Sequence, residues 1–581
     1  MTATANGDVK DRVEALLATM PLADKVGLMF HAAVSPTDVD SRHPIFGSPS
    51  VRELVTEHRM THFNILGSAP SGREFAQWHN AVQRIAAELP SSVPVTFSTD
   101  PRHHFSDNPA ASMMAGPFSQ WPEPIGLAAI GSEELMERFG DIARQEYVAV
   151  GLRVALHPQV DLATEPRWAR ISGTFGEDAE LTGRLAAAYI RGFQGPQLGA
   201  SSVATMTKHF PGGGPQKDGT DPHFSTGREQ VYPGNNFEYH LRPFLAALAA
   251  GGSQIMPYYG MPVGTDLEEV GFSFNQAVIT GILRERLGFE GVVCTDWGLI
   301  VGKPEFGEMG AAKAWGVEHL SIEERIIKVL DAGVDQFGGE TCTDVLLGLV
   351  ERGAVTEARI DESARRILAE KFRLGLFDTP FVDEDAADAV VGNATFRAAG
   401  LQAQCDSLTL LTNRERAGAP MLPLPRGLRV YTEGLADEAL AGFATPVGSI
   451  ADADVAIMRL HAPYETLGDG FAAYFHSGSL EFPADELARI QAVCAAVPTV
   501  MDIALDRPAV LTDLVDTAGA IVANFGVCEA ALLDVLFGDS APQGKLPFDL
   551  PRSMAAVLAA RSDVAFDTED PVFRFGHGLT Y

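Results

Sequence analysis

Residues 291–300, GVVCTDWGLI, carry the pattern that decides the fold. Val292, Val293 and Cys294 predict a short buried strand, and Asp296 follows that strand almost at once. A carboxylate at the exit of an apolar strand is costly to bury unless something there requires its charge. The stretch therefore predicts a strand whose C-terminal end faces a polar site.

Similar apolar segments alternate with longer amphipathic segments from about residue 60 to residue 375. These segments are THFNIL, VPVTFSTD, LRVALHPQVDL, SVATMTKHF, SQIMPYYG, GVVCTDWG and AGVDQF. Repeated strand–helix alternation predicts a parallel sheet, and this many units predict a closed, TIM-like (β/α)8 barrel. In such a barrel the active site lies at the C-terminal ends of the strands.

Several of these strands end in polar side chains. They are Asp100, Asp161, Lys208, His209, Tyr258, Tyr259 and Asp296. A single polar residue at a strand end is equally well explained as a helix cap. A series of them at the same end of parallel strands predicts one shared pocket.

A second α/β region follows the barrel. Its strand-like segments are SLTLLT, GLRVYTE, DVAIMRL, TVMDIAL and GAIVANF. The sequence thus predicts a barrel over residues 1–378, a polar linker over residues 379–394, and a smaller α/β domain with an open parallel sheet over residues 395–581.

Composition narrows the classes of partner. The chain has 581 residues and a formal net charge of −32, which disfavours binding to nucleic acid or to an anionic membrane. The first 30 residues lack a signal-peptide pattern, and no run of 18 apolar residues occurs. The five cysteines are scattered and odd in number, as is typical of reduced core residues. We therefore expect a cytoplasmic protein.

A metal site is the main alternative chemistry. Five histidines lie at or after predicted strand ends and could act as ligands together with Asp296: His103, His104, His157, His209 and His223. Against this, no HxH or HExxH pair occurs, and Lys208 would repel a cation beside His209. We expect no metal and no cofactor.

Six motifs, in order, resemble those of glycoside hydrolase family 3. They are PRWAR with FGED (166–178), KHFPGGG (208–214), TDW (295–297), RRILAEKFRLGLF (365–377), GKLPFDLP (544–551) and FGHGLTY (575–581). The resemblance implies a TIM-like barrel followed by an α/β sandwich domain, with the active site between them. It also implies a retaining exo-acting glycosidase.

The resemblance assigns two catalytic carboxyl groups. Asp296 falls at the position of the family's nucleophile. The acid/base is assigned to Glu465, because PYETLGD resembles a segment of the plant exo-glucanase branch, and Glu481 is its rival. Asp221 and His223 resemble the Asp–His acid/base of N-acetylglucosaminidase members, although their spacing and surroundings differ.

The remaining matches imply residues that bind the sugar. They are Asp100, Arg170, Lys208, His209, Tyr259 and Trp297. The sequence departs from the common family pattern at Ala169, around Asp100 and after the glycines at residues 212–214, and the last departure concerns aglycone specificity.

The implied function is a β-glucosidase acting on β-linked gluco-oligosaccharides or aryl β-glucosides. A β-xylosidase, a β-N-acetylglucosaminidase, a transglycosylase or phosphorylase, and a metal-dependent hydrolase remain as alternatives. A homodimer is also compatible with the sequence.

Overall fold

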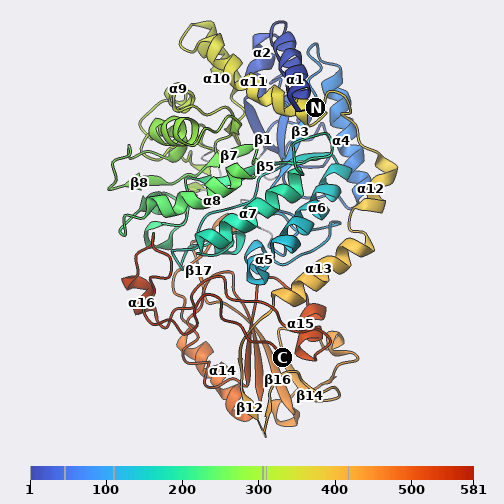
Figure 1. Cartoon of the computed structure of the whole chain (residues 1–581), viewed down its shortest axis with the longest axis vertical. Coiled ribbons are helices and arrows are strands. Elements are labelled where there is room, and N and C mark those ends of the chain that lie inside the picture. The colour runs from blue at the N-terminus through green and yellow to red at the C-terminus, as the bar shows by residue number, and fades with distance from the viewer. Residues whose placement is uncertain are drawn as a thin grey trace.

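The computed structural model describes residues 2–44, 47–106, 108, 112–303, 307–308, 310–416 and 418–581. Figure 1 shows a larger body built from the N-terminal part of the chain and a smaller body built from the C-terminal part. Helices α12 (Glu384–Val390) and α13 (Ala394–Ser407) run along one side, from the larger body to the smaller one.

The larger body is the predicted barrel. Its eight strands are parallel and follow the order β10-β1-β2-β3-β4-β5-β7-β9. They are β1 (Phe30–Val34), β2 (His62–Ile65), β3 (Thr96–Thr99), β4 (Leu152–Ala155), β5 (Ala204–Phe210), β7 (Gln254–Pro257), β9 (Val292–Val293) and β10 (Phe337–Gly338). A parallel bridge between Cys294 and Gln336 joins the two ends of this order and closes the barrel.

Strand β1 lies outside the region of predicted alternation, which starts near residue 60. Its five residues, Phe-His-Ala-Ala-Val, are too short and too rich in alanine to give a strand signal. Pairing with β2 and β10 specifies this strand, because each neighbour supplies the hydrogen bonds that the segment lacks alone.

Helices surround the barrel. The main ones are α4 (Gly72–Ala87), α6 (Glu133–Ala149), α7 (Ala179–Gln194), α8 (Phe237–Ala249), α9 (Ile322–Ala332), α10 (Thr343–Glu351) and α11 (Glu357–Arg373). Helix α11 ends at Arg373, and Gly375 then takes a left-handed turn with φ of 70°. The buried Lys371 amine holds α11 to the barrel, donating to the carbonyls of Thr61 (3.0 Å) and Pro94 (2.9 Å).

The smaller body contains a six-stranded sheet in the order β11-β20-β19-β16-β14-β15. The strands are β11 (Thr409–Asn413), β14 (Arg429–Glu433), β15 (Thr445–Pro446), β16 (Val455–His461), β19 (Thr499–Ala504) and β20 (Ala520–Asn524). The sheet is parallel except for β11, which runs antiparallel to β20. The expectation of a wholly parallel sheet is thus wrong at one edge, where an antiparallel strand is common in sheets of this kind.

The segment predicted as a linker is partly helical. Helix α12 packs on α4, where the Asn80 side-chain amide donates to the carboxylate of Glu384 (2.8 Å) and the Arg73 guanidinium pairs with Asp385 (2.5 Å). The polar composition of residues 379–394 therefore reflects a helix with an exposed outer face.

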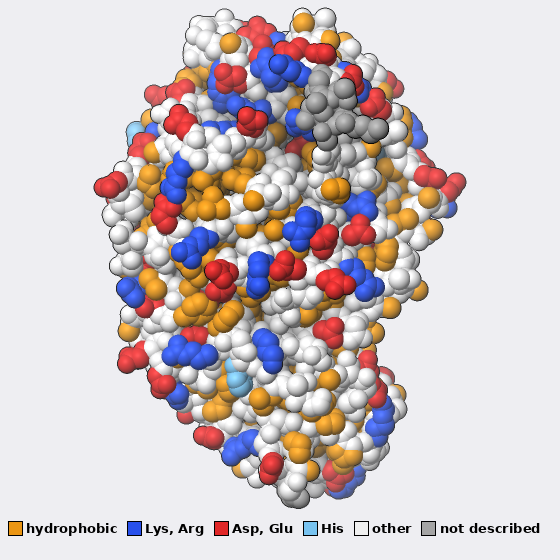
Figure 2. All heavy atoms as spheres, viewed as in Figure 1, with side chains coloured by type: hydrophobic (Ala, Val, Ile, Leu, Met, Phe, Trp, Pro, Cys, Tyr) orange, Lys and Arg blue, Asp and Glu red, His pale blue; other side chains and the backbone are white. Residues whose placement is uncertain are grey.

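Buried carboxylates join the two bodies. Glu177, which follows β4, accepts hydrogen bonds from the backbone amides of Asp549 (2.6 Å) and Phe566 (2.8 Å) in the smaller body. All five cysteines are free. The described part of the chain contains no helix that is both long and apolar enough to cross a membrane. Figure 2 shows acidic and basic side chains interspersed over one face of the molecule, without a broad basic patch.

Candidate active site

A cavity of about 540 Å³ opens at the C-terminal ends of the barrel strands. The barrel residues predicted as nucleophile and sugar-binding residues all line it: Asp100, Arg170, Lys208, His209, Tyr259, Asp296 and Trp297. Of the polar strand-end residues predicted to share one pocket, Asp161 and Tyr258 do not line it. The second domain contributes Asp469, Gly470 and Phe471 to the same wall. We call this space the Asp296 cavity. The strand ends converge there as predicted, because the barrel places them all at one rim.

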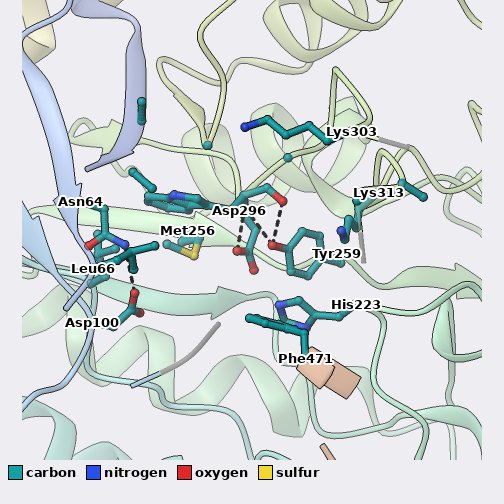
Figure 3. A pocket seen from close by; sticks show the side chains of 18 of the residues that line it. Asn64, Leu66, Asp100, His223, Met256, Tyr259, Asp296, Lys303, Lys313 and Phe471 are labelled. Carbon is teal, nitrogen blue, oxygen red and sulfur yellow. Dashed lines mark hydrogen bonds between the residues drawn. The ribbon is translucent and has the colours of Figure 1, made fainter. Parts of the chain in front are cut away.

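The Asp296 carboxylate has a hydrogen-bond partner at one oxygen and none at the other among the described residues. Its Oδ1 accepts a hydrogen bond from the Trp297 amide (2.8 Å), and the same amide also donates to the Tyr259 hydroxyl (3.0 Å). Oδ2 has no hydrogen-bond partner among the described residues, and His209 Nε2 lies 3.8 Å from it. Figure 3 shows this carboxylate beside the Tyr259 phenol, with His223 below. A fixed carboxylate with one free oxygen is suited to nucleophilic attack.

Asp100 and Lys208 form a buried ion pair in the same cavity. The Lys208 ammonium donates to Asp100 Oδ1 (2.8 Å), and the side-chain amide of Asn64 donates to Asp100 Oδ2 (3.1 Å). Both members of the pair are less than a tenth exposed. Such an arrangement presents fixed donors and acceptors to several hydroxyl groups, which is what recognition of a sugar ring requires.

His209 is oriented by Asp161, which the sequence also places at a strand end. Its Nδ1 lies 2.6 Å from Asp161 Oδ2. Burial lowers the pKa of His209 well below its usual value, and the positive charge of Arg170 lowers it further. Burial also raises the pKa of Asp161 to about 6. The imidazole is therefore neutral, with Nδ1 engaged by Asp161 and Nε2 on the side of Asp296.

Arg170 supplies a permanent positive charge to the cavity. Burial alone would lower its pKa, but Tyr258, Asp221 and Asp296 around it raise the pKa above its ordinary value. Its guanidinium carbon lies 6.0 Å from the centre of the Tyr258 ring. This buried cation offsets part of the negative charge of the acidic side chains around it.

His223 also lines the Asp296 cavity, and Asp221 lies directly behind it. Asp221 Oδ1 lies 2.6 Å from His223 Nδ1, while Asp221 Oδ2 accepts from Trp168 Nε1 (3.0 Å) and the Tyr258 hydroxyl (3.1 Å). Burial alone would raise the pKa of Asp221, but the charge and hydrogen bond of His223 and the charge of Arg170 lower it below its usual range.

The sequence analysis gives this pair only as an alternative, because an Asp and a His occur together on the loop after β5 but with a spacing that differs from that of the N-acetylglucosaminidase members. Contacts from other parts of the chain, which the sequence does not show, hold the pair in place. Trp168 and Tyr258 hold Asp221 from segments distant in the chain, and the ring of Phe475 from the second domain packs 5.0 Å from that of His223.

The structure does not bring Glu465 to Asp296. Glu465 is exposed and lines a separate hollow of about 730 Å³, together with Glu481, and we call this space the Glu465 hollow. Glu465 lies in β17 (Glu465–Thr466), which pairs with β18 (His476–Ser477), and its Oε1 is 3.5 Å from the Ser479 amide. Asp469 and Phe471, a few residues further along the chain, line the Asp296 cavity, and Glu465 does not. Asp296 and the two glutamates predicted as its partner thus line different spaces, and the assignment of Glu465 or Glu481 as acid/base stays a prediction.

The histidines of the alternative metal site are engaged separately. His103 Nε2 lies 2.9 Å from the Glu146 carboxylate, His104 Nδ1 lies 2.6 Å from the Pro122 carbonyl, and His157 contacts the Tyr189 hydroxyl. Within the described residues, no group of three or more His, Cys, Asp or Glu side chains could hold a metal ion.

Comparison with known protein families divides the chain into the same two domains as the structure. The signature of "Glycosyl hydrolase family 3 N terminal domain" matches residues 49–369, and that of "Glycosyl hydrolase family 3 C-terminal domain" matches residues 389–581. The chain belongs to glycoside hydrolase family 3. These two domains are the barrel and the sandwich domain, which confirms the predicted fold.

Curated members of family 3 match the chain over nearly its whole length. "Beta-glucosidase C" of Emericella nidulans is 50% identical over 99% of this chain and 92% of its own length. "Periplasmic beta-glucosidase/beta-xylosidase" of Dickeya chrysanthemi is 40% identical over 98% and 90%. Among solved structures, the exo-1,3/1,4-beta-glucanase of a Pseudoalteromonas species has the same fold, with a TM-score of 0.79 at 21% identity, covering 99% of this chain and 74% of that one.

Proposed function

We propose that this family 3 glycoside hydrolase is a retaining exo-β-glucosidase that releases glucose from the non-reducing end of β-gluco-oligosaccharides or aryl β-glucosides. The observation that carries the proposal is the Asp296 carboxylate, which lines a cavity together with Asp100, Arg170 and Lys208 and whose Oδ2 has no hydrogen-bond partner among the described residues. The near relatives named as β-glucosidases, 49% and 50% identical over almost the whole chain, support the same activity.

The reaction has two steps. In the first, Asp296 attacks the anomeric carbon while a proton donor protonates the departing glycosidic oxygen, leaving a covalent glycosyl-enzyme. In the second, the deprotonated donor takes a proton from water, which attacks the same carbon and releases Asp296. Asp100, Lys208 and His209 bind ring hydroxyls, and Arg170 places a positive charge beside the reacting centre.

We assign the proton transfer to His223, with Asp221 as its orienting partner. His223 lines the Asp296 cavity, whereas Glu465 and Glu481 line the Glu465 hollow. Asp221 engages Nδ1 at 2.6 Å, so that Nε2 is the nitrogen left to exchange a proton with the glycosidic oxygen or with water. Glu465 as acid/base stays a prediction that requires its loop to take another position.

Azide rescue decides between these donors. The variants His223→Ala, Glu465→Ala and Glu481→Ala are each assayed on a 2,4-dinitrophenyl β-glucoside, whose leaving group needs no protonation. We expect only His223→Ala to accumulate glycosyl-enzyme and to be accelerated by azide, with β-glucosyl azide as product. Rescue of Glu465→Ala or Glu481→Ala instead assigns proton transfer to that glutamate and overturns the assignment to His223.

Preference between glucose and xylose is the finer part of the proposal. The Dickeya relative carries both activities in its name. We propose glucoside as the better substrate. Comparing kcat/KM for p-nitrophenyl β-glucoside and β-xyloside tests this, and a higher value for the xyloside contradicts it. Activity that survives a chelator excludes the metal-dependent alternative.

Two broader expectations also remain proposals. We propose a cytoplasmic location, supported by five free cysteines, which cell fractionation would test. A homodimer is proposed from the sequence alone, and light scattering of the purified protein would test it.

A further inference from the structure

Arg507 lies where the two domains meet and contacts both. It is fully buried and follows β19, at the end of the second-domain sheet. Its guanidinium donates from one nitrogen to the Arg167 carbonyl in the barrel (2.9 Å) and from another to the Pro463 carbonyl in the second domain (2.8 Å). A planar guanidinium can make both bonds at once, which a lysine ammonium does less well in a fixed geometry.

These two carbonyls belong to segments that border the Asp296 cavity. Arg167 lies three residues before Arg170 on the loop after β4, and the carbonyl of Arg167 is the acceptor that Arg507 engages. Pro463 begins residues 463–478, which we call the 463–478 loop, and this loop carries Asp469, Gly470 and Phe471 into the cavity wall. A single side chain thus ties the barrel rim to the base of this loop.

Asp506 fixes the other end of the 463–478 loop. Its carboxylate lies 2.6 Å from Nδ1 of His476, a residue of β18. The His476 ring stacks on Tyr464 with ring centres 3.6 Å apart, so the two ends of the loop also contact each other. Between these ends, Phe475 is buried against the rings of His223 and Phe224 of the barrel loop after β5 (5.0 and 5.2 Å).

We propose that Arg507, assisted by Asp506, is a positioning residue that seats the 463–478 loop on the barrel rim and thereby fixes the part of the cavity that binds the aglycone. Figure 3 shows Phe471 beside His223, on the far side of the cavity from Asn64 and Asp100. The inference rests on the proposed function, because it assigns the Asp100 side to the glucosyl unit and the Phe471 side to the leaving group.

The position of the loop matters differently for the two halves of the reaction. Departure of a sugar, and transfer of glucose to a sugar acceptor, both need a ring bound on the Phe471 side. Hydrolysis of the glycosyl-enzyme by water does not need such a ring. A defect confined to this loop therefore weakens cleavage of a disaccharide and transfer to a sugar acceptor more than it weakens hydrolysis of an activated aryl glucoside.

The test compares Arg507→Met and Arg507→Lys with Arg489→Met. Arg489 is a half-exposed arginine of the second domain that pairs with Glu433 and Glu486 at the Glu465 hollow. Three quantities are measured: kcat and KM for laminaribiose, kcat for 2,4-dinitrophenyl β-glucoside, and the ratio of transfer to hydrolysis with a glucoside acceptor.

We expect both Arg507 variants to raise the KM for laminaribiose and to lower the transfer ratio, by about tenfold for methionine and less for lysine. The kcat for the dinitrophenyl glucoside should change by less than about threefold, because water needs no aglycone site. Arg489→Met should match the wild type. Phe471→Ala, which leaves Arg507 in place, should reproduce the transfer defect.

Two results would overturn the proposal. One is an unchanged transfer ratio in a folded Arg507→Lys protein. The other is an equal loss on all substrates, which would make Arg507 a residue of general stability. If the methionine variant does not fold, the lysine and Phe471→Ala variants still decide. A wild type that cleaves no β-glucoside would instead reject the proposed function.

Discussion

The barrel side and the second-domain side of the Asp296 cavity are built differently. On the barrel side, Asp100, Lys208 and Asp296 are each less than a tenth exposed and each makes at least one hydrogen bond to a fixed partner. On the second-domain side, Asp469 is exposed and Phe471 is half-buried, both on a loop. Packing in the barrel core fixes the barrel side of the cavity, whereas the second-domain side depends on the position of the 463–478 loop.

This difference indicates which part of the substrate the enzyme recognises most specifically. Buried polar groups discriminate well because a substrate that fails to pair them leaves a donor or acceptor unsatisfied, at about 1–3 kcal/mol each. Exposed loop residues lose little when a partner is missing, because water replaces it. We therefore expect strict recognition of the glucosyl ring and tolerance toward the aglycone.

Replacing Asp296 should have the largest effect. Asp296→Asn keeps the shape of the side chain but removes the nucleophile, so kcat/KM should fall by at least about 10³-fold on every β-glucoside. A 2-deoxy-2-fluoro-β-glucoside with a dinitrophenolate leaving group should label a peptide that contains Asp296 in the wild type. The matched change Asp469→Asn, on the loop side of the same cavity, should cost less than about threefold. A larger loss for Asp469→Asn would contradict the contrast between the two sides.

Breaking the Asp100–Lys208 pair should have the next largest effect. Asp100→Asn leaves the Lys208 ammonium buried without its charge partner, so kcat/KM should fall by about 100-fold. The loss should be the same for aryl glucosides with different aglycones, because this pair contacts only the glucosyl unit. Steady-state kinetics on a series of aryl glucosides measures it. A loss that varies with the aglycone would place the pair on the wrong side of the cavity.

The smallest effect concerns the carboxylate that joins the two domains. Burial raises the pKa of Glu177 to about 8, from a value near 4.5 in an unfolded chain. Between these pH values the folded state holds a proton that the unfolded state has lost, so the free energy of unfolding falls as the pH rises from about 5 to about 8. Urea unfolding should show a decrease of about 1–3 kcal/mol over this range.

Variants separate this contribution from others. Glu177→Gln cannot ionise, and its unfolding free energy should depend less on pH than that of the wild type. Glu180→Gln, an exposed neighbour on α7, should keep the wild-type dependence. Equal slopes for all three proteins would show that Glu177 ionises normally in the folded state.

Sequence patterns predicted most of the barrel because its strands are apolar, its helices are amphipathic and its chain alternates between them. They did not indicate β1, whose alanines carry no strand preference, or the antiparallel direction of β11, which is a matter of pairing. They also identified Asp100, Lys208 and Asp296 in the cavity wall, because each lies at a strand end. The Glu465 assignment came from a motif on a loop, where one turn of the backbone changes the space a side chain enters.

The sequence by itself determined the barrel, the second α/β domain and the series of polar residues at the strand ends. Hydrophobic periodicity and the alternation of strands with helices along the chain are local properties, so they can be read without the structure. Tertiary structure alone decided which groups stand opposite Asp296. The alignment of Asp221 and His223 depends on Trp168 and Tyr258, and the seat of the 463–478 loop depends on Arg507. Those contacts join segments far apart in the chain, and only the packing of the two domains brings them within hydrogen-bonding distance.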